Sequence, residues 1–106
     1  MVTRGEVWWV EDPDTGRRPH LVLTRDGVVA KLHSVLVVPA TTKIRNIPTE
    51  VSLGREDGMP RECVLSLDNV AQMPKAFFVE PICRLSNDRM REVCKALAIA
   101  TGCDRR

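Results

Sequence analysis

The sequence has no tyrosine, and aromatic side chains make up only 4% of its 106 residues. This scarcity argues against a protein that binds nucleic acid on an aromatic-rich stacking surface. The chain also lacks a run of about 18 apolar residues, which excludes a transmembrane helix. It has no pattern of a secretory leader. We therefore expect a protein that acts in the cytoplasm and needs no membrane.

Several familiar catalytic motifs are absent as well. There is no P-loop, no G-x-G-x-x-G turn, no H-E-x-x-H and no G-x-S-x-G. The two histidines, His20 and His33, can form an acid/base pair in principle, but a histidine beside an apolar strand or in a polar connection is usually structural. Sixteen basic and fourteen acidic residues give a net charge of +2, which neither identifies a nucleic-acid binder nor excludes one.

The four cysteines lack the close C-x-x-C spacing of a zinc site. Without a secretory leader, a disulfide framework is also not expected. We predict four free thiols in a reducing cytoplasm, with Cys63 and Cys94 in the hydrophobic core. We expect neither a metal nor another cofactor.

The length and the hydrophobic fraction of 43% predict one ordinary globular domain over residues 1–106. Six short segments have the composition of β-strands. Two of them, 21–24 and 35–38, are continuous apolar runs, which is typical of strands buried on both faces. The predicted strands are 6–10, 21–24, 35–38, 50–53, 63–67 and 77–80.

Helical periodicity is clear only near the end of the chain. Ser86 can cap the first turn of a helix there, and Gly102 can end it. Short strands followed by one amphipathic helix predict a mainly β protein, a small β-barrel with a C-terminal α-helix. The residues that recur at three and four residue spacing are Met90, Val93, Cys94, Leu97, Ala98 and Thr101.

Polar residues gather at three predicted strand ends. Arg18 precedes the second strand, Thr41 follows the third, and Asp68 follows the fifth. If these ends meet on one rim of a barrel, a guanidinium fork and a hydroxyl can bind phosphate there. The same residues are equally compatible with an ordinary polar surface, and their spacing does not decide between the two.

Five parts of the chain then share their order with a known family. They are R-G-E-V-W-W-V from Arg4, G-R-R-P-H-L-V-L from Gly16, V-V-P-A-T-T from Val37 with I-P-T-E-V from Ile47, S-L-D-N-V from Ser66, and R-L-S from Arg84. In this order they resemble the MazF/PemK family of toxin endoribonucleases. Any one segment is a weak signal, but together they cover nearly the whole chain.

The resemblance implies an SH3-like barrel, a homodimer, a MazE-like antitoxin partner and metal-independent cleavage of single-stranded RNA. It implies catalytic roles for Arg18, the arginine before the proline, for Thr41, the threonine after V-V-P-A, and for Asp68, the acidic residue of its segment. We expect the RNA groove to cross the two-fold axis. Predicted RNA-binding residues are Arg17, Thr42, Lys43, Arg45 and Asn69.

In such a reaction the ribose 2′-OH attacks the adjacent phosphorus, and the products are a 2′,3′-cyclic phosphate and a 5′-OH. We expect Arg18 to stabilise the developing charge as a fixed cation and Thr41 to donate to a non-bridging oxygen. Asp68 either accepts the 2′-OH proton or holds Arg18 or a base.

Two other interpretations stay open at this point. A gyrase poison of the CcdB type shares the fold but acts through a C-terminal Trp-Gly-Ile tail, and this chain ends Gly-Cys-Asp-Arg-Arg. A non-enzymatic SH3-like module that binds RNA or peptide would not need Arg18 and Thr41 at one site. The first loop is short and acidic, and Asn69 stands where the family often has glutamine, so the resemblance does not carry over a cleavage sequence.

Overall fold

The first two strands form a hairpin that carries part of the candidate site. The computed structural model describes residues 1–105, and in it β1 (Glu6–Asp12) and β2 (Gly16–Val22) pair antiparallel. Trp9 lies opposite Pro19, and Val10 lies opposite Arg18. Side chains directly opposite each other in an antiparallel pair lie on the same face of the sheet, so Trp9 and Pro19 share one face of the hairpin.

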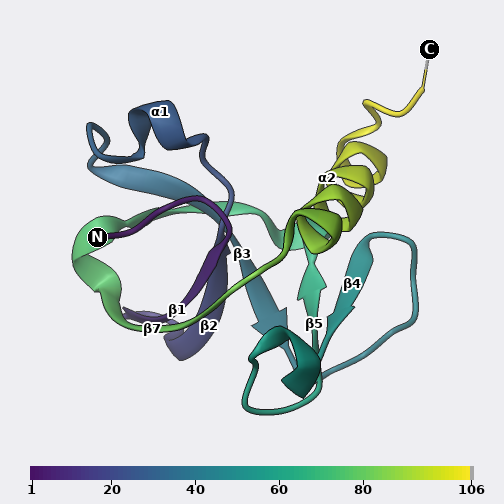
Figure 1. Ribbon diagram of the computed structural model, residues 1–106, viewed down its shortest axis with the longest axis horizontal. Helices are drawn as coiled ribbons and strands as arrows, with labels where there is room; N and C mark the ends of the chain where they lie inside the picture. The colour runs from purple at the N-terminus through teal and green to yellow at the C-terminus, as the bar shows by residue number, and fades with distance from the viewer. Residues whose placement is uncertain (106) are drawn as a thin grey trace.

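Strand β3 (Ser34–Thr41) is the centre of the sheet. One of its edges pairs with β2, and its other edge is divided between β6 (Ala71–Pro74) and β5 (Cys63–Ser66). The sheet continues through β5 to β4 (Glu50–Leu53) and through β1 to β7 (Phe78–Arg84), giving the antiparallel order β4-β5-β3-β2-β1-β7 (Figure 1).

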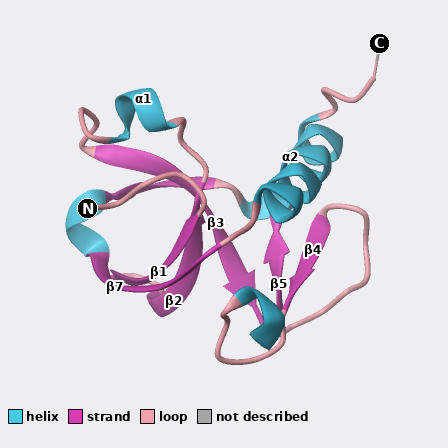
Figure 2. Ribbon diagram, viewed as in Figure 1, coloured by secondary structure: helices cyan, strands magenta, loops and turns pink. Residues whose placement is uncertain are grey.

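One long helix, α2 (Asn87–Thr101), packs near β4 (Figure 2). The hydroxyl of Ser86 accepts a hydrogen bond from the Arg89 amide at 3.2 Å, and Gly102 ends the helix in the left-handed conformation at φ 76°. Both predicted caps are therefore confirmed. The other helical elements are short connections: α1 (Asp26–Val29), η1 (Arg55–Asp57), η2 (Leu67–Asn69) and η3 (Lys75–Phe77).

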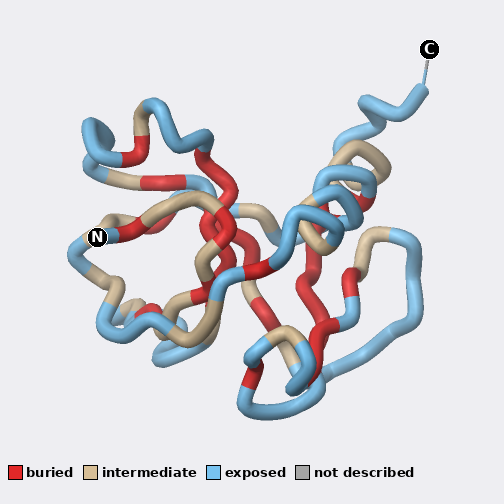
Figure 3. Tube along the Cα trace, in the orientation of Figure 1, coloured by how far each residue is buried: buried red, intermediate tan, exposed pale blue. Residues whose placement is uncertain are grey.

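The central strands are buried on both faces, as their apolar runs predict. Leu21 and Val38 belong to a core cluster that α2 covers with Val93 and Ala96, whereas their neighbours Val22 and Val37 belong to a second cluster. Figure 3 shows this burial concentrated along the central strands, with exposed residues in the outer loops. Each fully buried aliphatic side chain contributes roughly 1.5–3 kcal/mol of transfer free energy.

The prediction of a mainly β fold with a C-terminal helix is confirmed, but some boundaries were wrong. The second strand begins at Gly16 and ends at Val22, so Arg18 lies inside it rather than before it. Strand β6 was not predicted at all. The predicted burial of Cys94 is also wrong, because α2 turns its Val93 and Ala96 face to the core and leaves Cys94 exposed. Cys63 is buried, as expected.

Within residues 1–105, no helix combines the length and the apolar character needed to cross a membrane. The predicted domain also includes Arg106, which lies outside the described residues.

Candidate active site

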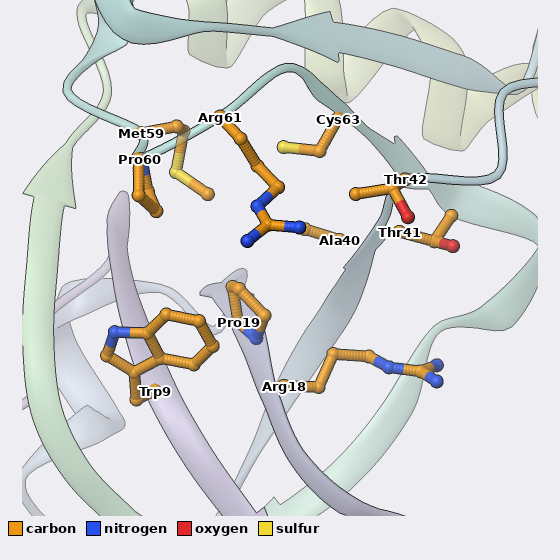
Figure 4. A pocket seen from close by; sticks show the side chains of 10 residues that line it. All are labelled: Trp9, Arg18, Pro19, Ala40, Thr41, Thr42, Met59, Pro60, Arg61 and Cys63. Carbon is orange, nitrogen blue, oxygen red and sulfur yellow. The ribbon is translucent and has the colours of Figure 1, made fainter.

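Two neighbouring cavities share Arg18 and Thr41. The Trp9 cavity has a volume of about 320 Å³ and the Lys43 cavity about 160 Å³. Figure 4 shows the first of them, with Trp9 and Pro19 on one side and Thr41 and Thr42 on another. The Trp9 cavity is lined by Trp9, Arg18, Pro19, Ala40, Thr41, Thr42, Met59, Pro60, Arg61 and Cys63. The Lys43 cavity is lined by Arg18, Pro39, Thr41, Lys43, Arg45, Glu50, Ser66 and Asn69.

The register of β2 and β3 explains why Arg18 and Thr41 meet. His20 pairs with Pro39 and Leu21 with Val38. Continuing the same antiparallel register places Arg18 opposite Thr41, just beyond the last paired residues. The pairing of β2 with β3 thus brings near each other two residues that are 23 positions apart in the sequence, and both line the two cavities.

The positive charge of Arg18 is available to an anionic ligand. Among residues 1–105, its guanidinium makes neither an ion pair nor a side-chain hydrogen bond, and the residue is exposed. Its backbone is fixed, because the Nδ1–H of His20 donates to the Arg18 carbonyl at 3.1 Å. A carbonyl oxygen only accepts hydrogen bonds, so this contact also assigns the proton to Nδ1.

The hydroxyl of Thr41 is oriented by its own loop. Its oxygen accepts a hydrogen bond from the Lys43 amide at 3.1 Å. A hydroxyl that accepts in this way keeps its own hydrogen for another partner. Thr41 can therefore donate into the space beside Arg18.

The loop after β3 bends around a carboxylate. Glu50 accepts hydrogen bonds at Oε1 from the amides of Arg45 and Asn46, at 3.0 and 2.9 Å. Asn46 has φ 57°, a left-handed conformation that asparagine tolerates better than most residues. This arrangement holds Lys43 and Arg45 along the Lys43 cavity.

The structure brings together most of the predicted site residues, but two lie apart. Asp68 lines neither cavity, and its Oδ2 accepts a hydrogen bond from the Thr49 hydroxyl at 2.6 Å. Arg17 lines a separate hollow at the hairpin tip and pairs with Glu11 at 3.3 Å and with Glu80 at 3.2 Å. The residues brought together are Arg18, Thr41, Thr42, Lys43, Arg45 and Asn69.

Among the cavity residues that were not predicted from the sequence are Trp9, Arg61 and Glu50. One signal could have found Arg61. It lies just before β5, and β5 pairs with the end of β3 that carries Thr41. Antiparallel pairing places the residues before one strand beside the residues after the other. Trp9 was assigned only to a strand, and its local pattern gives no sign of the cavity.

The histidines do not form a pair. His20 is buried, and this burial lowers its pKa below the usual value, with the nearby Arg18 charge acting in the same direction. His33 is exposed and lies at a surface hollow beside Lys31 and Lys75. In the described part of the chain, no three histidine, cysteine or acidic side chains are grouped so that they could hold a metal ion.

The sequence as a whole matches a family model described as "PemK-like, MazF-like toxin of type II toxin-antitoxin system" over residues 3–101. Two relatives come from Mycobacterium tuberculosis (strain ATCC 25618 / H37Rv). The probable endoribonuclease MazF5 is 44% identical over 106 residues, which cover 99% of this chain and 97% of the relative. The probable endoribonuclease MazF2 is 41% identical over 101 residues, which cover 94% and 98%.

Solved structures match the fold closely. An endoribonuclease from mycobacterial species, solved in complex with its cognate antitoxin, has a TM-score of 0.87 and 26% identity, covering 96% of each chain. The Mycobacterium tuberculosis toxin MazF-mt6 has a TM-score of 0.85 and 28% identity, covering 92% of this chain and 96% of that one.

Proposed function

The chain belongs to the PemK-like, MazF-like family of toxins of type II toxin–antitoxin systems and is an endoribonuclease toxin, and we propose that it cleaves single-stranded mRNA with Arg18 and Thr41 as catalytic residues. The scissile phosphate binds between these two side chains, where the Trp9 and Lys43 cavities meet. The cut is metal-independent and leaves a 2′,3′-cyclic phosphate and a 5′-OH.

One observation carries this proposal: in the described part of the chain, an arginine without a carboxylate partner and a threonine with an available hydroxyl line the same two cavities. When the 2′-oxygen attacks phosphorus, negative charge grows on the non-bridging oxygens. A preorganised cation and a hydroxyl donor stabilise that charge without reorganising. An arginine side chain is a permanent cation in proteins, so charge stabilisation is the role that we propose for Arg18.

The attack forms the 2′-O–P bond and releases the 2′-OH proton, which a carboxylate of the Lys43 cavity is placed to accept. The P–O5′ bond breaks, and the leaving 5′-oxygen takes up a proton from water to become the 5′-OH. Glu50 is the one acidic residue among the described residues that line the two cavities. Its Oε1 is held by two backbone amides, which leaves Oε2 for the substrate. We assign Asp68 to positioning, since it binds the hydroxyl of Thr49, the residue before Glu50.

We further propose the assembly and partners that the family likeness implies. The chain forms a homodimer with an RNA groove across the two-fold axis, acts in the cytoplasm and is inhibited by a MazE-like antitoxin. Exposed apolar side chains at Ile44 and Ile47, on the loop beside the Lys43 cavity, support a partner surface there. Light scattering at micromolar concentration should give the mass of a dimer, and a fully active monomer would overturn this assembly.

The reaction is tested by incubating the purified protein with a long single-stranded transcript in EDTA. Discrete cuts that end in a cyclic phosphate support metal-independent cleavage, whereas RNA that stays intact in EDTA overturns it. Intact RNA with and without added divalent cations would instead support a non-enzymatic binding module. Glu50→Gln should lower kcat more than Asp68→Asn, and the reverse order would return the proton-accepting role to Asp68.

A further inference from the structure

We infer that the Trp9 cavity is a nucleobase-binding slot, which receives the base next to the scissile phosphate and prefers guanine. This inference rests on the proposed function for the location of the phosphate. The slot has three parts, which are an apolar lining, a fixed indole wall and an arginine that reaches into the opening.

The lining suits the flat, weakly polar face of a base. Between Trp9 and Thr41 it consists mainly of Pro19, Ala40, Met59 and Cys63. Among the residues that the structure describes, no carboxylate lines this cavity, so none of them repels an RNA strand there. Its volume of about 320 Å³ is at the lower end of ligand pockets, which favours one small planar group.

The indole of Trp9 is held in place before any ligand arrives. The Arg17 guanidinium lies over the ring, 4.9 Å from its centroid. That guanidinium is itself held between the carboxylates of Glu11 on β1 and Glu80 on β7. Arg17 does not line the cavity, and Pro19, directly opposite Trp9, does. Arg17 is therefore a positioning residue for a stacking wall, which explains why it lies apart from Arg18.

Arg61 supplies the polar contact that selects a base. Its side chain projects from the loop before β5 toward the centre of the cavity (Figure 4). Within the described residues it makes neither an ion pair nor a side-chain hydrogen bond. A guanidinium fork matches two adjacent acceptors, and guanine presents such a pair at O6 and N7. Adenine presents N7 beside an amino donor, which the fork cannot bond.

The two cavities then divide the strand between them. The Trp9 cavity combines a largely apolar lining with Arg18 and Arg61, whereas Lys43 and Arg45 line the Lys43 cavity. The sugar–phosphate backbone follows these cations, the scissile phosphate lies at Arg18 and Thr41, and one neighbouring base enters the slot. The residues that select the base are therefore different from the residues that act on the scissile phosphate.

Binding tests this directly and does not require cleavage. The probes are fluorescent 2′-deoxy heptamers with uracil bases at six positions and guanine, adenine, cytosine or 7-deazaguanine at the centre. They lack the attacking 2′-OH and stay intact. We expect anisotropy titrations to show about tenfold tighter binding of the guanine probe than of the other three by the unaltered protein. In Arg61→Ala the four affinities should become equal, and Arg61→Lys should restore overall affinity but not the preference.

The two adjacent tryptophans give a matched control. Trp8 lies outside the cavity and packs edge-on against Phe78, with ring centroids 6.0 Å apart. Trp9→Leu should weaken every probe by about tenfold or more, since it removes a stacked base contact. Trp8→Leu should leave affinities unchanged, and Trp9→Phe should recover part of the loss. Circular dichroism checks that each variant is folded.

Equal affinity of the unaltered protein for all four probes would overturn the inference, as would an Arg61→Ala variant that still prefers guanine. Cleavage of a random-sequence RNA pool keeps this outcome distinct from failure of the proposed function. Cuts without a guanine beside them overturn the slot alone. A protein that prefers guanine in binding but cuts no RNA overturns the proposed reaction and leaves the slot intact.

Discussion

Two arginine-centred regions of the molecule use the same side chain in opposite ways. Around Arg18 and Arg61, the guanidinium groups have no carboxylate partner within the described residues, and they face cavities. At the start of α2, Arg89 contacts three acidic residues, Asp57 at 2.9 Å, Glu92 at 2.7 Å and Glu56 at 3.8 Å. The first region has charge to offer a ligand, and in the second it is already neutralised.

This contrast shows how to interpret a basic residue in a chain with a net charge near zero. Arg17 and Arg18 are neighbours in the sequence, yet within residues 1–105 Arg17 is paired with two carboxylates and Arg18 with none. An unpaired cation beside a cavity keeps its affinity for phosphate, whereas a paired one must first give up its partner. Whether an arginine can bind a ligand or instead stabilises the fold therefore depends on the acidic residues around it.

The largest expected effect comes from the unpaired region. Arg18→Ala should lower kcat for RNA cleavage by about a hundredfold to a thousandfold or more, because it removes a preorganised cation from a developing anion. Thr41→Ala should lower it by a similar factor. Arg18→Lys should recover little, since a point charge does not reproduce the guanidinium fork. Single-turnover cleavage assays measure these rates.

Folding should be unaffected by Arg18→Ala, because the side chain is exposed and its loss opens no core cavity. Arg91→Ala, which removes an exposed cation from α2, is the matched control for charge and should cut normally. An Arg18→Ala protein that cuts at the normal rate would erase the distinction between the two regions.

The paired region should respond in stability instead. Arg89→Ala leaves Asp57, whose side chain is 7% exposed, without its guanidinium partner. We expect the free energy of unfolding in urea to fall by about 2 kcal/mol, while the folded variant cuts within about threefold of the normal rate. Arg91→Ala should change stability by less than about 0.5 kcal/mol, since surface pairs contribute little. Loss of cleavage without loss of stability would contradict this assignment.

A smaller effect should distinguish cations that contact the RNA backbone from surface cations that are paired within the protein. Lys43→Ala and Arg45→Ala should each weaken RNA binding a few-fold and make its logarithmic salt dependence shallower by about 0.7, the value for one phosphate contact on a single strand. Arg84→Ala, whose guanidinium lies 4.0 Å from Glu6, should leave the slope unchanged. Binding measured across a series of salt concentrations tests this, and equal slopes for all three variants would be the contrary result.

The smallest expected effect is a loss of folding stability on acidification. It should occur at a higher pH through His20, next to Arg18, than through Asp57, next to Arg89. Burial lowers the pKa of His20, so the unfolded chain binds more protons than the folded one. The contribution of His20 to the free energy of unfolding is therefore fully present above about pH 6.5, and it declines as the pH falls below that value. The hydrogen bonds from Arg89 lower the pKa of Asp57, so its contribution declines only below about 3.8.

Urea unfolding between pH 7.5 and 3 measures both declines. His20→Ala should abolish the first and leave RNA cleavage at pH 7.5 within about tenfold of normal. Asp57→Asn should abolish the second. A first decline that survives in His20→Ala would show that another group titrates there, and an inactive His20→Ala protein would revive the acid/base pair of histidines.

Local patterns were enough to predict the elements whose own residues determine them. The apolar runs at β2 and β3 indicate strands buried on both faces, and Ser86 with Gly102 fixes both ends of α2. Strand β6 has no such pattern, because its four residues, Ala71–Pro74, are extended only through pairing with β3. The exposure of Cys94 likewise depends on how α2 is rotated against the core, which the spacing of apolar residues did not specify.

The candidate site divides in the same way. Arg18 and Thr41 were placed by family resemblance, and the sheet register explains their meeting. Arg61 and Trp9 belong to the same cavity only because β5 pairs with β3 and β1 with β2. The pairing of Arg17 with Glu80 joins β2 to β7, two strands far apart in the chain. Contacts of that kind depend on the assembled fold and leave no trace in a short window of sequence.

The pairing of β1 with β7 also determines when, during translation, this part of the sheet can form. It joins residues near position 6 to residues near position 84. A ribosome that adds about 5 to 20 residues per second needs roughly 4 to 16 s to make the intervening stretch. Until then β1 has no partner on that edge, and Glu80 cannot secure Arg17 above Trp9. A cell that makes this toxin thus gains an interval of seconds per molecule, during translation, in which the nascent chain is present but the base-stacking wall that we propose at Trp9 is incomplete.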